Sequence, residues 1–268
     1  MTAAHAQAPI APRGYTARIS KGGALIGETT ALLREWEPCL SVADLYARVV
    51  EGNALGKATR SRARDILGRV FVPRFLAPGQ PAATALKALV QGGADQVVVQ
   101  RLVLYHAALA DHLLYDCVAG ELYRLHEDGH YGVTVEDMLA FLRGLISAGR
   151  ITPPWSASMV TRTAQGLLAT CRDAGLLQGA VRKSFAPVYL PFEAFAYVAY
   201  ALKDRGLAGA SVVDHRDWRL FLLSRDDVER LFVEAEGRRL LRYQAAGDIR
   251  RIDWTYATLE EAVHGLGY

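Results

Sequence analysis

The chain contains one pattern with possible catalytic chemistry, His-Glu-Asp-Gly-His at residues 126–130. Two histidines one helical turn apart bind zinc in metalloproteases, and the glutamate beside them acts as the base. That geometry needs a continuous helix, whereas Asp-Gly is a strong turn signal and Gly132 follows closely. We therefore expect His126 and His130 at or beyond a helix end, as solvated boundary residues. A zinc metalloprotease remains a remote alternative.

A second pattern is a helix with one polar face that suits nucleic acid. Ser156 follows two prolines and Trp155, so it can cap a helix that Gly175 would end. One face of this helix is apolar and is expected to pack on a core. The opposite face contains no acid, which favours contacts with phosphates and base edges. Its candidate contact residues are Ser158, Thr161, Arg162, Gln165 and Arg172.

The sequence after Gly175 predicts a β-hairpin. Residues 176–181 and 185–190 are short apolar runs, and the residues between them are Arg182, Lys183 and Ser184. Such a hairpin would carry two bases at its tip. Arg182 and Lys183 are therefore further candidate nucleic-acid contacts.

A helix is also predicted upstream, over residues 134–149. Thr134 to Asp137 resembles a capping box, and the apolar residues that follow recur at helical spacing. Helix, turn, helix and hairpin is the order of a winged-helix domain. Winged helices read DNA in some proteins and dock other proteins elsewhere, so the order of elements leaves both possibilities open.

A third feature is a basic segment between Lys57 and Arg74, which has six bases and the single acid Asp65. This local excess is larger than the net charge of +3 of the whole chain, so the rest of the chain is slightly acidic. Bases beside an apolar stripe often only lie along a core, whereas uncompensated charges favour a polyanionic partner. The candidate contacts are Lys57, Arg60, Arg62, Arg64 and Arg69.

The elements that position these residues are mostly helical. Residues 94–126 are apolar nearly all round, which predicts a central buried helix or a broken helix pair. Near the end of the chain, residues 239–244 and 249–254 are predicted strands joined by a short turn. We divide the chain into a disordered tail (1–14), a helical N-terminal domain (15–130), a winged-helix-like domain (131–208) and a mixed helix and hairpin part (209–268).

The composition is typical of a globular protein, with 268 residues, 51% apolar and 22% charged. Its three cysteines show no paired spacing, which argues against a disulfide framework and favours a reducing cytoplasm. The first residues have no pattern of a secretion signal. No uncharged run reaches the roughly 18 to 20 residues that a membrane-spanning helix needs, so no membrane partner is expected.

Other enzyme classes are disfavoured because the chain has no GxxxxGK phosphate loop, no GxGxxG after a strand and no GxSxG elbow. We therefore expect no catalytic residue, no metal and no cofactor. His106 and His112 lie among apolar residues and are expected to be satisfied helix positions rather than ligands.

Two stretches resemble the BrxA family of bacterial BREX phage-defence systems. One is residues 15–28, Tyr-Thr-Ala-Arg-Ile-Ser-Lys-Gly-Gly-Ala-Leu-Ile-Gly-Glu, and the other is the Asn-led, Arg-rich block at residues 53–69. In layout the resemblance extends from about residue 15 to 205. It implies a helical N-terminal domain similar to NusB-type bundles, a winged-helix part and binding of double-stranded DNA.

The sequence thus predicts a mainly α protein: a helical, NusB-like N-terminal bundle, a winged-helix domain and a small mixed α/β C-terminal part. Its expected function is that of a non-catalytic accessory protein that binds double-stranded DNA in a BREX-type system. The alternative is an interaction scaffold that docks another component of the same system.

Overall fold

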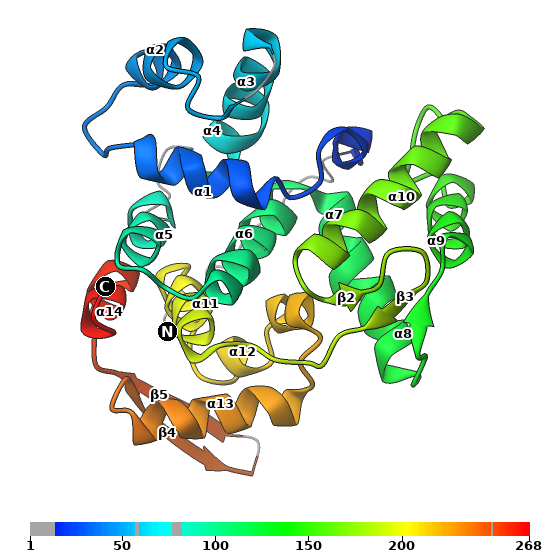
Figure 1. Ribbon diagram of the computed structural model, residues 1–268. Coiled ribbons are helices and arrows are strands. Elements are labelled where there is room, and N and C mark those ends of the chain that lie inside the picture. Colours follow the sequence, from blue (N-terminus) through cyan, green and yellow to red (C-terminus); the bar gives the residue numbers. More distant parts are fainter. Residues whose placement is uncertain (1–13, 57–58, 77–81, 248) are drawn as a thin grey trace, which may run out of the picture.

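A computed structural model describes residues 14–56, 59–76, 82–247 and 249–268 (Figure 1). The chain is mainly helical with small antiparallel sheets, which confirms the predicted class. The helices are, in chain order, η1 (Ala17–Lys21), α1 (Ile26–Glu35), α2 (Val42–Glu51), α3 (Arg60–Ile66), η2 (Leu67–Phe71), α4 (Val72–Phe75), α5 (Ala82–Gln91), α6 (Gln96–Ala110), α7 (His112–Asp116), η3 (Cys117–Leu122), α8 (Tyr123–Glu127), α9 (Val135–Ser147), α10 (Ala157–Asp173), α11 (Phe192–Asp204), α12 (Ala210–Val213), η4 (Arg216–Phe221), α13 (Arg225–Gly237) and α14 (Leu259–Gly265). The strands are β1 (Gly132–Val133), β2 (Leu177–Gln178), β3 (Lys183–Phe185), β4 (Leu241–Ala246) and β5 (Ile249–Trp254).

The apolar segment 94–126 forms a broken helix pair, which is the second of its two predicted forms. Asp111 separates α6 from α7, and its carboxylate accepts hydrogen bonds from the backbone N–H groups of Leu113 and Leu114 at the start of α7. The axes on the two sides of this break differ by 113°. In the described part of the chain, no single helix is long and apolar enough to span a membrane. The bent pair reaches that length and apolar composition only when its two halves are counted together.

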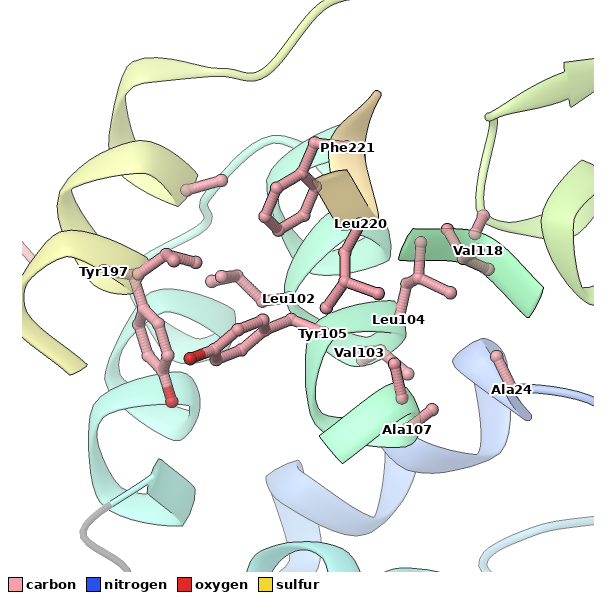
Figure 2. Packing of buried hydrophobic residues seen from close by; sticks show 14 of the residues in the cluster. Ala24, Leu102, Val103, Leu104, Tyr105, Ala107, Val118, Tyr197, Leu220 and Phe221 are labelled. Atoms are coloured by element: carbon pink, nitrogen blue, oxygen red, sulfur yellow. The ribbon is translucent and has the colours of Figure 1, made fainter. Parts of the chain in front are cut away.

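Helix α6 lies in the middle of the hydrophobic core, because all of its residues from Arg101 to Ala108 are buried. Figure 2 shows Leu102 and Tyr105 of α6 packed near Tyr197 of α11 and near Leu220 and Phe221 of η4. Residues distant in sequence therefore share one core with α6. A helix that is apolar on all sides is expected in that position.

A buried acid fixes η4 against α6, α7 and α11. Asp217 is 1% exposed and accepts hydrogen bonds from the hydroxyls of Tyr105 and Tyr115 and from the guanidinium of Arg205. Burial raises the pKa of this carboxyl, but hydrogen bonding to His215 and Tyr115 and the positive charge of Arg205 outweigh it and lower the pKa to about 2. The C-terminal part is thereby tied to the central helices.

Two helices begin where the sequence predicts. Thr134 and Asp137 form a reciprocal capping box at the start of α9. Ser156 caps α10 by accepting a hydrogen bond from the backbone of Met159. Gly175, at φ 75°, follows the end of α10, so the helix limits are confirmed at both of its ends.

The hairpin after α10 is confirmed, but its strands are shorter than predicted and its turn lies earlier. Lys183 is the first residue of β3 and not part of the turn. The chain reverses at Gly179, whose φ of 93° favours glycine and whose Cα lies too close to the carbonyl of Arg182 for a side chain. A third strand that the sequence did not predict, β1, pairs with β3, and the sheet order is β1-β3-β2.

The second predicted hairpin is confirmed as β4 and β5. They pair in register from Leu241 opposite Trp254 to Ala246 opposite Ile249. Strand β4 begins two residues later than predicted, since Arg239 has a left-handed φ of 60° that is incompatible with a strand. Helix α13 packs against β4, and α14 packs against α5 and α11.

Candidate nucleic-acid interface

The polar face of α10 is on the surface, as predicted. Ser158, Arg162, Gln165 and Arg172 are exposed and Thr161 is half-buried. The apolar face is buried, and its residues are Val160, Ala164, Leu167, Leu168 and Cys171. Some polar groups of the face have partners within the helix. Thr161 donates its hydroxyl to the carbonyl of Ala157 at 3.0 Å.

The bases of α10 differ in how much of their charge is available. Arg172 forms an ion pair of 2.7 Å with the neighbouring Asp173. Arg162 donates from Nε to the carbonyl of Ser158 at 3.3 Å and makes no ion pair with the described residues. Arg162 is therefore the better placed of the two for a phosphate.

A buried arginine holds the C-terminal end of α10. Arg101, on α6, is 5% exposed, and its guanidinium donates hydrogen bonds to the carbonyls of Ala174, Gly175 and Tyr189. Burial lowers the pKa of Arg101. A cation at this point complements the negative end of the helix and satisfies carbonyls that no helical N–H reaches. The exposed face of α10 is thus attached to the core helix.

The hairpin presents one freely exposed base. Arg182 is exposed near the tip, whereas Lys183 is half-buried and donates to the carbonyl of Ala180 at 3.1 Å. Val181, which directly precedes Arg182, is 94% exposed. In the view of Figure 1 the hairpin lies beside α10 on the side away from α3.

The basic segment faces solvent less than its charge suggests. Lys57 lies outside the described residues. Arg60 and Arg64 are exposed on α3 and make no ion pair with the described residues. Arg69 is exposed but pairs with Asp65 at 3.2 Å. Two of the five candidate contacts on this segment are therefore exposed without an acidic partner.

The other two bases of this segment turn toward the body of the protein. The guanidinium of Arg62 packs against Gly22, where a Cβ would lie 3.1 Å from Nη2. Arg74 donates from Nη1 to the carbonyl of Ala24 at 2.9 Å, and burial lowers its pKa to about 10. The expectation that such bases lie along a core therefore holds for Arg62 and Arg74.

The segment between these two surfaces was not among the predicted contacts. Residues 15–24, which we call the N-terminal strap, include η1 and pack closely on α10. The backbone of Ile19 and Ser20 lies against Gly166, and Arg18 of the strap is exposed. The strap therefore lies between α3 and α10 (Figure 1). The hairpin lies further from α3, beyond α10 in this view.

The histidine pair lies where a turn signal would put it. Helix α8 ends at Glu127, and Asp128 and Gly129 form a turn in which Gly129 has a φ of 77°. The predicted position at a helix end is confirmed. His130 is exposed, but His126 is not simply solvated, because its ring packs edge-on against Phe185 at 5.1 Å and its Nδ1 is buried without a hydrogen bond.

Within the described ranges, no three His, Cys, Asp or Glu side chains are grouped closely enough to hold a metal ion. The prediction that His106 is a satisfied helix residue is confirmed. His106 lies on α6, and its Nε2 lies 2.8 Å from the hydroxyl of Tyr197. The three cysteines are free thiols, with Cys39 exposed and the other two buried.

A cleft of about 690 Å³ opens beside the strap, between α1, α6 and the end of α10. Arg34 contributes a base to its wall, while Glu28 and Asp173 contribute acids. A wall of mixed sign does not favour a polyanion. The acid-free part of α10 and the exposed bases of α3 remain the stronger candidates.

These features define a mainly helical protein with exposed bases on α3, the strap and α10. The chain belongs to the BrxA family, whose model matches residues 13–201, and is thus a component of BREX defence. That family is generally non-catalytic. The C-terminal part with α13 and the β4–β5 hairpin lies beyond the matched residues.

Solved structures with a similar fold exist. One of them is an uncharacterized protein from Magnetospirillum magneticum, with a TM-score of 0.60 and 14% sequence identity over 78% of this chain and 98% of that chain. At this identity the likeness shows the fold alone. Among curated proteins, no match to this chain was found.

Proposed function

We propose that this BrxA-family chain is a non-catalytic protein that binds double-stranded DNA, and that the winged-helix-like domain (131–208), together with α8 before it, contains a winged helix. The observation that carries the proposal is the exposed face of α10 from Ser158 to Gln165, which contains no acid. The order α8, β1, α9, α10, β2, β3, in which β1 pairs with β3, supports the winged-helix assignment. The resemblance of residues 15–28 and 53–69 to the family agrees with it.

The chemistry of the exposed side chains favours binding without strong sequence preference. Arg60, Arg64, Arg162 and Arg182 are long cations suited to phosphate oxygens. Ser158 and Gln165 are exposed groups that can donate to or accept from base edges. Because phosphate contacts release counterions, the affinity is expected to fall steeply with salt.

The direct test is fluorescence anisotropy of purified full-length protein with a labelled duplex in a series of salt concentrations from about 50 to 200 mM. We expect saturable binding that weakens steeply and that an unrelated duplex of equal length competes away. Absence of binding at low salt, or an affinity that salt does not change, would contradict the proposal.

Paired variants locate the contact surface. Arg162→Ala with Arg182→Ala, and Arg60→Ala with Arg64→Ala, are each expected to weaken binding. The matched control is Arg230→Ala on α13 with Arg238→Ala directly after that helix, because both of these arginines are paired with acids, Asp227 and Glu234. Unchanged melting temperatures show that each variant is folded. If the control weakens binding as much as the test pairs do, the surface is not the one proposed.

A second candidate function is docking of another component of the same system. Large apolar side chains are exposed around the three-stranded sheet, with Tyr131 at 87%, Val181 at 94% and Tyr189 at 61%. Large apolar groups exposed on the surface around one sheet favour an interaction site there. Under this function, Val181→Ser with Tyr131→Ser would leave DNA affinity unchanged and reduce co-purification of the partner component. Weaker DNA binding instead would assign these residues to the DNA surface.

A further inference from the structure

The β4–β5 hairpin is fixed to the body of the protein by one of its two faces. Tyr243 of β4 stacks on Phe232 of α13, with 5.3 Å between the ring centroids. Trp254 of β5 packs edge-on against Tyr200 of α11 at 4.8 Å. Both strands thus contribute aromatic rings to the core, and the hairpin is a fixed part of the surface.

Four polar side chains lie together on the other face of the hairpin. Arg242 lies opposite Asp253, and Gln244 lies opposite Arg251. Directly opposed residues of an antiparallel pair project on the same side, and so do alternate residues of one strand. All four residues are exposed, and we call this surface the ribbon face.

The ribbon face repeats the chemistry of the polar face of α10. Arg242, like Arg162 of α10, is exposed and makes no ion pair with the described residues. Arg251 pairs with Asp253 at 3.0 Å, as the second arginine of the α10 face pairs with its neighbouring acid. Each surface also has an exposed glutamine, which is Gln244 on the hairpin. An unpaired base suits a phosphate, and an amide suits a base edge.

The spacing within the ribbon face fits a DNA duplex. Alternate residues of an antiparallel strand are about 6.8 Å apart, which is twice the roughly 3.4 Å per nucleotide along one DNA strand. Arg242 and Gln244 can therefore face positions two nucleotides apart. A two-stranded ribbon, whose strands lie about 4.8 Å apart, is also narrow enough for the major groove, which is about 12 Å wide.

The ribbon face and α10 are separate surfaces. Helix α10 packs against α9 and η1, whereas the hairpin packs against α12 and α13. Figure 1 shows the hairpin at the lower edge and α10 at the upper right. Both strands of the hairpin also follow residue 201, where the match to the family model ends. A contact made by the ribbon face is thus additional to that of α10.

We propose that the ribbon face is a second contact surface for duplex DNA, separate from that of α10. This inference rests on the proposed DNA binding. Arg242 contacts a phosphate, and Gln244 bonds to the DNA backbone or to a base edge. Asp253 limits the affinity, because it neutralises Arg251 and lies opposite Arg242 on the same face.

The sharpest test removes the acid of the ribbon face. Asp253→Asn keeps a polar side chain of similar size and frees Arg251 from its ion pair. We expect a duplex affinity about threefold higher at about 100 mM salt and a salt slope steeper by about 1, as for one added phosphate contact. Fluorescence anisotropy measures both quantities. A gain of affinity cannot result from loss of folding.

The matched control is Asp226→Asn on α13. Asp226 is exposed and makes no ion pair with the described residues, and its substitution changes the net charge by the same amount. We expect this variant to keep the salt slope of the wild type. If Asp226→Asn strengthens binding as much as Asp253→Asn does, the overall charge explains the gain and the ribbon face is not a DNA surface.

Loss of the unpaired base is expected to have the opposite effect. Arg242→Ala should weaken binding about threefold and lower the salt slope by about 1, and Arg242→Lys should restore most of the slope because a phosphate contact needs the charge. In combination with Arg162→Ala the two losses should add, because distant sites without shared partners act independently. Thermal denaturation checks that each variant is folded.

The outcomes separate the two proposals. If the wild type binds no duplex, the proposed function is wrong and the ribbon face falls with it. If the wild type binds but Asp253→Asn and Arg242→Ala change neither affinity nor slope, the DNA function stands and the ribbon face is not a DNA surface. An acidic protein surface would then be the partner that its arginines fit.

Discussion

Helices α3 and α10 both carry bases, but they use them differently. In α10 the bases lie on the exposed face, while the buried face includes Thr163 and Thr170 beside its apolar residues, and Arg162 is exposed without an acidic partner in the described part of the chain. In the segment that starts with α3, Arg74 donates to a backbone carbonyl and Arg69 pairs with Asp65. The number of bases in a segment therefore overstates the charge that a polyanion can meet.

The difference has a physical origin in the space around each helix. The strap covers one side of α3, so an arginine there must lie under other backbone and satisfy its N–H groups locally. Helix α10 is covered on its apolar side and along Gly166, which leaves its polar side open. The predictions below test which bases hold the fold and which are available for DNA.

The largest effect is expected at Arg101, which holds α10 in place and is itself buried. Arg101→Ala leaves the carbonyls of Ala174 and Gly175 without their donor. Because charged hydrogen bonds in buried positions contribute about 1.5 to 3 kcal/mol, we expect a loss of about 3 kcal/mol in the free energy of unfolding. Urea denaturation measures this loss. A stability equal to that of the wild type would show that α10 does not depend on this cap.

The next prediction compares two bases of the basic segment: Arg74, which is buried against Ala24, and Arg64, which is exposed. Arg74→Ala removes a charged hydrogen bond to Ala24 and is expected to cost about 2 kcal/mol of unfolding free energy. Arg64→Ala is expected to leave stability unchanged and to weaken DNA binding. Thermal denaturation and anisotropy on both variants provide the measurement. The comparison between inward and outward bases fails if the two variants exchange these phenotypes.

Local sequence signals predicted the elements around α10 well. Thr134 and Ser156 are capping residues whose effect depends on the next three residues, so the starts of α9 and α10 could be read from the sequence. The apolar stripe beginning at Val160 gave the buried face correctly.

Features that depend on distant parts of the chain were not predictable in this way. Strand β1 has only two residues and exists because β3 pairs with it. Arg62 lies against Gly22, and Arg74 donates to the carbonyl of Ala24; this glycine and this alanine lie about forty to fifty residues earlier in the sequence. Arg18 carries no motif of its own, and its position between two basic helices follows only from the packing of the strap.

The pH dependence of stability tests the environment of His106, a buried histidine near Arg74. Burial, together with the positive charge of Arg74, lowers the pKa of His106 to about 3. The unfolded chain binds a proton on this histidine below about pH 6.5, and the folded chain does not, so the unfolding free energy falls as the pH drops from 6.5 toward 3. At pH 5 the loss from this group is about 2 kcal/mol.

The matched variant is His106→Gln, which can keep a hydrogen bond to Tyr197 but does not titrate. Urea denaturation at several pH values between 7.5 and 4.5 is expected to give a flatter stability profile for this variant than for the wild type. Arg74→Ala should also flatten the profile partly, since it removes one cause of the lowered pKa. Parallel profiles for the wild type and His106→Gln would show that His106 titrates normally.

The smallest effect distinguishes two arginines on the same helix. Arg162 lacks an acidic partner among the described residues, so contact with a phosphate releases a full counterion and Arg162→Ala should reduce the salt slope by about 1. Arg172 is already neutralised by Asp173 at 2.7 Å, so Arg172→Ala should change the slope less. The Asp173→Asn variant, which frees Arg172, should then raise the slope above that of the wild type. Equal slopes in all three variants would mean that α10 does not contact phosphates.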